Sequence, residues 1–336
     1  MNDELKFTVI SDTHYYSKKN FVDGFDKNKK PKPGQLFFSR SEEIVEHTFD
    51  CLCKNDTPDI VLISGDLTYN GERTSHDEMK AALKKLQQKG KRVYVITATH
   101  DYTTPRMPTY GIDKNDKYIE VESVNRTQLL KYYGDFGYNN AIAKHKSTMS
   151  YVAQLADGYR LFALNDDYGD PDCGFSDELM NWVKTEANNA KRDGQYIIAM
   201  THHPLVPPSP IYAAVAKGDM LNEYELRRNQ LSDLGFDFVL TGHTHMHNIS
   251  YCKIGNKKFY DISTAALTGF PPYYRQIVLN KEQKKAEIKT ICADCADSID
   301  TNGLALEEYT KDLFLGLYQK HCTMPNMTTT ILPTLP

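Results

Sequence analysis

Long hydrophobic runs are missing from this sequence, which contains no apolar stretch approaching the roughly 20 residues that a transmembrane helix needs. We therefore expect no membrane span. The opening residues, MNDELKFTVI, also lack the basic segment and apolar core of a signal peptide. These absences predict a cytoplasmic protein, although a signal peptide removed before this numbering begins would make the protein secreted.

Cysteines are few and do not form a disulfide framework. The seven cysteines are an odd number spread over 336 residues, whereas small disulfide-rich domains carry an even number at dense spacings. Cys292 and Cys295 form a C-x-x-C pair, a spacing that zinc and redox sites share with ordinary thiols near a turn. We favour ordinary thiols, because this pair stands alone in the sequence.

A strong charge of either sign is missing as well. The formal net charge is −4, so the chain as a whole has no general attraction for nucleic acid or for anionic membranes. We therefore expect no nucleic-acid partner. The 40% of hydrophobic and 25% of charged residues are typical of a soluble globular protein, and 336 residues suffice for one large domain or two ordinary ones.

Short apolar runs alternate with amphipathic helical patterns through most of the sequence. The run IVLI, for example, is continuous, as in a strand that is buried on both faces. Strands that alternate with helices predict a layered α/β fold, and the strands joined by short turns after Gly242 predict antiparallel pairing. We predict strands at 6–10, 60–63, 93–96, 161–164, 196–200, 238–240, 249–252, 258–262 and 276–279, and helices at 39–54, 76–89, 176–189 and 222–234, the last two capped by Ser176 and Asn222.

Residues 1–289 are predicted to form one domain with irregular insertions near 103–146 and 204–218. The first insertion is rich in tyrosine and the second in proline, and each begins close to candidate functional residues. Long irregular segments inside a compact domain are usually functional loops, so we favour a role at the site over a surface elaboration. Residues 290–336 are predicted to form a tail whose helix, with apolar residues at helical spacing from Leu306 to Leu317, packs on the domain. Its end, TTTILPTLP, is expected to be irregular.

Five short clusters hold residues of the types that bind metal ions, and each directly follows a predicted strand. In open α/β sheets such groups gather beyond the carboxyl ends of the strands, so we expect the clusters to meet at one edge. Alternate residues of a strand share a face, which predicts that both members of a D-x-H or H-x-H triplet point to the same side. The clusters are Asp12-Thr13-His14, Gly65-Asp66, His100-Asp101, His202-His203-Pro204 and Gly242-His243-Thr244-His245.

Together, the clusters supply carboxylates and imidazoles, a mixture of donors that suits Mn, Fe or Zn better than Ca. Asp66 is the natural bridge, because a carboxylate between two cations offsets their mutual repulsion. Gly65 and Gly242 allow the backbone to turn sharply and approach the site. A pair of such metal ions is able to cleave phosphate esters.

The order D-x-H, G-D, H-D, H-H-P and G-H-x-H resembles the pattern of the calcineurin-like metallophosphoesterases over roughly residues 6–280. The resemblance implies a four-layer α/β/β/α sandwich of two mixed sheets flanked by helices, with a dinuclear metal centre. His202 is chosen over His203, because the family ligand stands two positions before the proline. The implied ligands are Asp12, His14, Asp66 and His245 for the first metal and Asp66, His202 and His243 for the second.

The resemblance also implies catalytic residues. His100 corresponds to the family histidine that contacts the phosphate and helps the leaving group, and Asp101 would orient its imidazole. The sequence departs from the family pattern at Thr99, where the family has an asparagine that ligates the second metal. The shorter hydroxyl side chain of Thr99 binds that metal directly, through a water, or not at all. His203 and Tyr102, which adjoin these residues, are candidate substrate contacts.

The function that the resemblance implies is metal-dependent hydrolysis of phosphate esters by in-line attack of a hydroxide that bridges two metal ions. We favour a small phosphodiester substrate, since the irregular segments after His100 and His202 resemble those that wall the pocket of family diesterases. One alternative, motivated by Thr99, is a non-catalytic or weakly active metal-binding protein of the same fold. A further alternative is a nuclease, which the acidic balance disfavours. The sequence indicates no oligomeric state.

Two more segments have open interpretations. The loop at 17–34 is locally basic, with six lysines against two aspartates. Because it begins just after His14, it either attracts an anionic substrate to the rim of the site or is an ordinary solvated loop. The tyrosines of the insertion at 103–146 would stack on a base or sugar, contact a lipid head group, or form a small satellite core.

Overall fold

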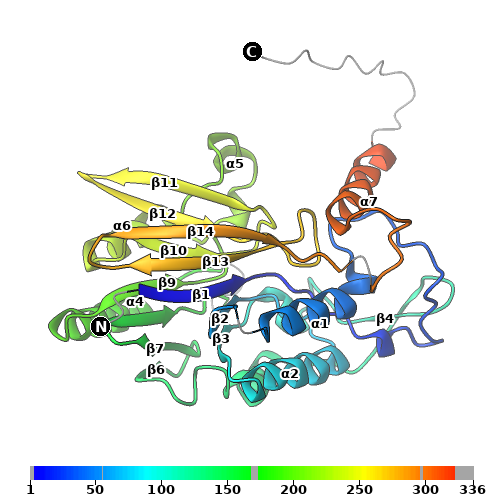
Figure 1. The fold of residues 1–336 in the computed structure, drawn as a ribbon, viewed down its shortest axis with the longest axis horizontal. Helices are drawn as coiled ribbons and strands as arrows, with labels where there is room; N and C mark the ends of the chain where they lie inside the picture. Colours follow the sequence, from blue (N-terminus) through cyan, green and yellow to red (C-terminus); the bar gives the residue numbers. More distant parts are fainter. Residues whose placement is uncertain (1–3, 55, 168–172, 296–297, 322–336) are drawn as a thin grey trace, which may run out of the picture.

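Two large mixed β-sheets pack face to face, with helices on the outer face of each (Figure 1). This arrangement is seen in a computed structural model that describes residues 4–54, 56–167, 173–295 and 298–321. The predicted irregular end of the tail, TTTILPTLP, lies outside the described residues. None of the helices within these ranges is long and apolar enough to cross a bilayer.

The first sheet has five strands in the order β14-β13-β1-β2-β3. β1, β2 and β3 are parallel neighbours, whereas β13 is antiparallel to both β1 and β14. β14 was missed in the sequence, because its segment KAEIKTIC is largely exposed and lacks an apolar run. The strands are β1 (Glu4–Ile10), β2 (Ile60–Ser64), β3 (Arg92–Ile96), β13 (Tyr273–Asn280) and β14 (Lys285–Cys292).

The second sheet has seven strands in the order β11-β12-β10-β9-β8-β7-β6. Its four central strands, β12, β10, β9 and β8, are parallel, and the outer pairs are antiparallel. The strands are β6 (Ala143–His145), β7 (Ser150–Ala156), β8 (Tyr159–Ala163), β9 (Tyr196–Met200), β10 (Phe238–Thr241), β11 (Asn248–Ile254) and β12 (Lys257–Ser263).

The apolar residues of the strands divide between three cores, which define four layers. In β2, Ile60 and Leu62 face the second sheet, whereas Val61 and Ile63 face the helices, so the continuous apolar run is buried on both sides as expected. The outer face of the first sheet is covered by α1 (Ser41–Leu52) and α2 (Arg73–Gln88). α4 (Asp177–Arg192) and α6 (Tyr224–Leu234) cover the second sheet. The predicted α/β/β/α sandwich is confirmed.

The two predicted helix caps had different outcomes. Ser176 caps α4 by accepting a hydrogen bond from the Leu179 backbone N–H at 3.1 Å, as predicted. The prediction that Asn222 caps α6 is wrong, because the residue before that helix is Glu223, which makes no side-chain cap. The backbone N–H of Asn222 instead donates to the Cys173 carbonyl at 2.7 Å, so this position is used to tie two segments together.

The insertion at 103–146 is less irregular than expected. It contains a small two-stranded sheet, β4 (Gly111–Ile112) and β5 (Tyr118–Ile119), a short helix α3 (Leu129–Tyr133), and the edge strand β6. The other insertion, at 204–218, contains α5 (Pro210–Val215), capped by Ser209. Both insertions therefore have secondary structure that the sequence patterns did not reveal.

Within the tail, α7 (Leu306–His321) packs on the body of the molecule. Leu306, Tyr309 and Leu313 contact the core beneath α1 and α2, and the Leu313 carbonyl accepts a hydrogen bond from the Gly34 backbone N–H at 3.2 Å. Because β14 continues to Cys292, the boundary predicted after residue 289 falls inside a strand.

Candidate metal centre

The five clusters meet where the carboxyl ends of the parallel strands of the two sheets face each other. Within the first sheet, the Asp12 backbone N–H donates to the Gly65 carbonyl at 3.1 Å. Within the second sheet, the Gly242 N–H donates to the His202 carbonyl at 3.0 Å. The sheets are joined at the site itself, because the His243 N–H donates to both carboxylate oxygens of Asp12, at 3.1 and 3.2 Å.

Two groups of side chains could each hold a metal ion. Asp12, His14 and His245 form one group and Asp66, His202 and His243 the other; within each group, the ligand-type atoms lie within 4.8 Å of one another. Asp66 connects the groups, since its Oδ2 lies 3.2 Å from Nε2 of His202 and 3.7 Å from Nε2 of His14. The structure thus brings together all six residues, in the grouping expected from the sequence.

The backbone aims these side chains by a different route from the one expected. Strand alternation does not place the members of the triplets on one side, because Asp12, His14, Asp66, His243 and His245 all have positive φ, between 38° and 64°. Such left-handed conformations are uncommon for residues other than glycine and carry strain. Five of them at one site indicate that the surrounding fold holds each side chain toward the centre at an energetic cost.

Two glycines allow the segments to approach one another. A Cβ atom on Gly65 would lie 2.7 Å from Nδ1 of His202, and Gly65 also has a φ of 100°. A Cβ atom on Gly242 would overlap the side chains of Ser11 and Asp12. Glycine is therefore required at both positions, as the sequence analysis inferred from the need for close backbone approach.

The donor atoms are arranged as cation ligands. Nδ1 of His202 donates to the Ser64 carbonyl at 2.8 Å, so the other ring nitrogen, Nε2, faces the carboxylate of Asp66 at 3.2 Å. Nε2 of His14 likewise faces Nε2 of His245 at 3.1 Å. Acceptors that face each other in a buried site need a proton or a metal ion between them. The carboxylate and imidazole set therefore fits divalent metal ions.

The electrostatics of the buried site agree with this fit. Burial raises the pKa of a carboxylate, but the neighbouring histidines outweigh burial and hold the pKa values of Asp12 and Asp66 below their ordinary range. Burial also disfavours the charged form of His202, yet the two aspartates raise its pKa well above its ordinary value. The site thus keeps its carboxylates ionised and attracts positive charge.

Asp166 is a supporting residue that the sequence analysis missed. Its buried carboxylate accepts hydrogen bonds from the Thr201 hydroxyl at 2.8 Å and from the His203 backbone N–H at 2.7 Å, and it lies 3.3 Å from Nδ1 of His203. It thereby fixes the segment that carries His202. The signal was present in the sequence, because Asn165-Asp166-Asp167 follows a predicted strand just as the other clusters do.

His100 lies at the centre, but Asp101 does not orient it as expected. The rings of His100 and His14 lie 4.9 Å apart, and Nδ1 of His100 contacts the Tyr69 carbonyl at 2.7 Å and Oδ1 of Asn70 at 2.8 Å. Those two groups orient the imidazole. The prediction that Asp101 orients His100 is therefore wrong. The Asp101 carboxylate instead accepts hydrogen bonds from the backbone N–H groups of Thr68 and Ala98, both at 2.9 Å. These bonds tie the loop after β2 to the loop after β3.

The three remaining candidates lie beside the centre. Thr99 is half-buried and begins a short 3-10 turn, next to His100, whose backbone N–H donates to Oδ1 of Asp66 at 3.0 Å. His203 is buried, and its ring lies 3.9 Å from that of His243. The Tyr102 hydroxyl donates to the Asp167 carbonyl at 3.4 Å. These positions do not test whether Thr99 binds a metal or whether His203 and Tyr102 contact the substrate, so these roles stay predictions.

The C-x-x-C pair takes no part in this centre. Cys292 and Cys295 are free thiols, and they belong to neither of the two possible metal-binding groups found among the described residues.

A solved structure shares this fold at low sequence identity, and others superpose on it less well. A dimetal phosphatase from Danio rerio superposes with a TM-score of 0.56 at 12% identity, covering 86% of this chain and 99% of that one. Thermus thermophilus sulfate thiohydrolase SoxB gives 0.43 at 12% identity, over 95% of this chain and 62% of that one. Plasmodium GAP50, described as the anchor in the inner membrane complex, gives 0.42 at 11% identity, over 98% of both chains.

Sequence comparison places the chain in a family. No curated protein sequence matches it. The family model for calcineurin-like phosphoesterases, however, matches residues 5–247, which contain both sheets apart from the last strands, and all five clusters. This match shows the family, and the shared fold and the two groups of ligand-type side chains agree with it. The chain belongs to the calcineurin-like phosphoesterases, which hydrolyse phosphate esters with the help of metal ions.

Proposed function

We propose that this protein is a phosphodiesterase with a dinuclear metal centre. Asp12, His14 and His245 would hold one metal ion, His202 and His243 would hold the other, and Asp66 would contribute to both. The observation that carries this proposal is the position of Asp66, whose Oδ2 faces one histidine from each group. Imidazole nitrogens and carboxylate oxygens together favour Mn, Fe or Zn as the metals.

Bound metal ions supply two things to phosphate-ester hydrolysis: a nucleophile made available at neutral pH, and neutralisation of charge on the phosphate oxygens. The chain supplies the surrounding geometry. His100 is held at Nδ1 by the Tyr69 carbonyl and Asn70, so its Nε2 is free to contact a phosphate oxygen or to protonate the leaving alkoxide. Asp166 and Asp101 hold the segments that carry His202 and His100.

Preference for a diester is supported by the two insertions. The segment at 103–146 follows the His100 cluster directly and contributes the aromatic side chains Tyr110 and Tyr118 to a cavity beside the centre. The segment at 204–218 follows His203, and the N–H groups of Leu205 and Val206 are fixed by the Asp261 carboxylate at 2.7 and 3.0 Å. Ordered walls next to a hydrolytic centre suit a substrate with a group on each side of the phosphate.

The test compares a diester with a monoester. After chelation and addition of Mn²⁺, we expect faster hydrolysis of bis(p-nitrophenyl) phosphate than of p-nitrophenyl phosphate. A strong preference for the monoester contradicts the diesterase proposal. Absence of turnover for both esters with Mn²⁺, Fe²⁺ and Zn²⁺ contradicts hydrolysis itself.

A weakly active or non-catalytic metal-binding protein is the second candidate, and Thr99 is the observation that favours it. The side chain that follows β3 has no amide oxygen to offer the second metal. In this case Thr99→Asn should raise both the bound metal and the turnover, whereas Thr99→Ser should raise neither. Robust turnover by the wild type, unchanged in Thr99→Asn, rules this candidate out.

A further inference from the structure

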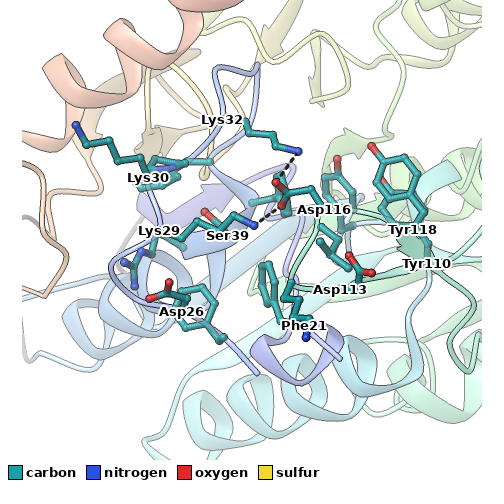
Figure 2. A pocket seen from close by; sticks show the side chains of 18 of the residues that line it. Phe21, Asp26, Lys29, Lys30, Lys32, Ser39, Tyr110, Asp113, Asp116 and Tyr118 are labelled. Carbon is teal, nitrogen blue, oxygen red and sulfur yellow. Dashed lines mark hydrogen bonds and ion pairs between the residues drawn. The ribbon is translucent and has the colours of Figure 1, made fainter. Parts of the chain in front are cut away.

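Figure 2 shows a cavity of about 440 Å³. It shares a wall with the candidate metal centre. The shared wall is Tyr69. Its side chain lines the cavity, its carbonyl accepts the hydrogen bond from Nδ1 of His100 at 2.7 Å, and its ring centroid lies 6.3 Å from that of His14. Tyr69 thus contacts both the candidate centre and the cavity, so a ligand that spans the two would lie against this side chain.

Two segments far apart in the sequence enclose the cavity. One is the basic loop after β1 and the other is the β4–β5 hairpin of the tyrosine-rich insertion. The Val22 backbone N–H donates to the Ile112 carbonyl at 3.0 Å. Lys29 and Lys32 both form ion pairs with Asp116, at 2.5 and 3.2 Å, as Figure 2 shows. The two segments that the sequence left with open interpretations thus form one site.

Aromatic rings line this cavity from both segments. Phe21 and Phe25 come from the basic loop, with ring centroids 5.1 Å apart. Tyr110 and Tyr118 come from the hairpin, lie 4.2 Å apart, and stand side by side in Figure 2. Tyr118 is 71% exposed, although such a large ring usually gains from contact with another apolar surface. Rings of this kind are stacking surfaces for a planar aromatic ligand.

The charged groups of the cavity favour an anionic ligand with a polar edge. Five cationic side chains line it against three carboxylates, which disfavours a quaternary ammonium head group. The ion pairs of Lys29 and Lys32 with Asp116 are partly exposed and therefore weak enough to exchange for a ligand anion. Asp26 and Asp113 offer carboxylate oxygens, which suit the N–H groups of a heterocycle.

We propose that this cavity binds the base of a nucleoside phosphoester whose phosphate is held at the metal centre. The base stacks against Tyr118 and Tyr110, while the positive charge of Lys29 and Lys32 attracts the anionic ligand during its approach. This inference rests on the proposed phosphodiesterase function and names the class of its substrate. In this proposal, the insertion selects the substrate by its base, and the five clusters carry out the hydrolysis.

The test uses two diesters with the same leaving group, the p-nitrophenyl ester of thymidine 5′-phosphate and methyl p-nitrophenyl phosphate. Wild-type protein loaded with Mn²⁺ should have a lower KM for the nucleotidyl ester. Tyr118→Ala should raise that KM about tenfold, as expected for the loss of one stacked base contact. The methyl ester has no base to contact Tyr118, so its kcat/KM should change much less than that of the nucleotidyl ester.

Two control variants separate stacking from other effects. Tyr118→Phe keeps the ring and should keep the low KM. Tyr251→Ala removes a tyrosine that is 52% exposed on β11, at the other end of the molecule from the β4–β5 hairpin (Figure 1), and should change neither ester. Equal KM values for the two esters in the wild type, or an equal effect of Tyr118→Ala on both, would overturn the inference.

A binding measurement keeps the inference separate from the proposed function. If neither ester is hydrolysed, the phosphodiesterase proposal fails, and calorimetry with thymidine 5′-phosphate and ribose 5-phosphate decides the role of the cavity. Tighter binding of the nucleotide, lost in Tyr118→Ala, supports a base site. Equal binding of the two, or tighter binding of phosphocholine than of the nucleotide, overturns it.

Discussion

Nε2 of His202 lies 3.2 Å from Oδ2 of Asp66, while the other ring nitrogen of His202 donates to the Ser64 carbonyl at 2.8 Å. Because Nδ1 carries the proton of this bond, Nε2 and the carboxylate face each other in a fully buried site and need a proton or a metal ion between them. A cation resolves this arrangement. The same carboxylate oxygen lies 3.7 Å from Nε2 of His14, so Asp66 is the side chain on which the two proposed metal positions would depend.

His100→Gln should lower kcat without removing the metals. His100 contacts Tyr69 and Asn70 through Nδ1 and is not part of either ligand group, and a positioned general acid contributes about 10²- to 10⁴-fold. The loss should be larger for alkyl leaving groups than for p-nitrophenolate, which needs no proton. The measurement is kcat across diesters whose leaving groups differ in pKa. An equal loss for all leaving groups contradicts proton donation.

Asp166→Asn should weaken metal binding, although Asp166 is not a ligand. Its carboxylate accepts the N–H of His203 at 2.7 Å and that of His202 at 3.2 Å, and loss of such support typically costs about 10- to 100-fold in metal affinity. Competition between the protein and a chelator for Mn²⁺ measures the change. Asp193→Asn, at an exposed aspartate paired with Arg160, is the matched control and should bind Mn²⁺ normally.

Glu72, which belongs to neither ligand group, should make stability depend on pH. Its side chain is fully buried, and burial raises its pKa from the ordinary 4.5 to about 7. At a pH between these two pKa values, the Glu72 carboxyl has lost its proton in the unfolded chain but keeps it in the native protein. The native state is therefore favoured fully below pH 4.5, and this contribution is lost as the pH rises to about 7.

The difference between wild type and Glu72→Gln isolates this effect. The neutral variant should gain stability relative to wild type as the pH rises from about 4.5 to 7, by a total on the order of 3 kcal/mol. Urea unfolding at a series of pH values measures it. A constant difference across that range shows that Glu72 does not titrate as its burial implies.

Most strands of the two large sheets, and the meeting of the six ligand-type side chains, could be predicted, because both depend on local patterns. A short, continuous apolar run such as IVLI at β2 is typical of a strand that is buried on both faces. Clusters that directly follow the strands of an α/β sheet are expected to meet at one edge. β14 could not be predicted in this way, since its exposed residues are placed by pairing with β13 rather than by burial. Pairing with the preceding strand across a short turn leaves no apolar pattern in the segment itself.

Contacts between loops escaped prediction for a similar reason. The partners of His100 are a carbonyl and an amide from the loop after Asp66, and no spacing within the sequence encodes that meeting. Asp101 was assigned to His100 because the two are adjacent, yet adjacent side chains on a 3-10 turn point in different directions. The positive φ angles of the ligand residues likewise arise from the packing of the assembled site.

Metal content measured together with activity tests the central claim most directly. The chain should be stripped with a chelator, reloaded with Mn²⁺, and analysed for bound metal per chain alongside hydrolysis of bis(p-nitrophenyl) phosphate. The account predicts two ions per wild-type chain, with activity restored in proportion to the bound metal. It also predicts that Asp66→Asn loses both the bound ions and the activity. Full activity in the stripped protein, or two tightly bound ions in Asp66→Asn, would contradict it.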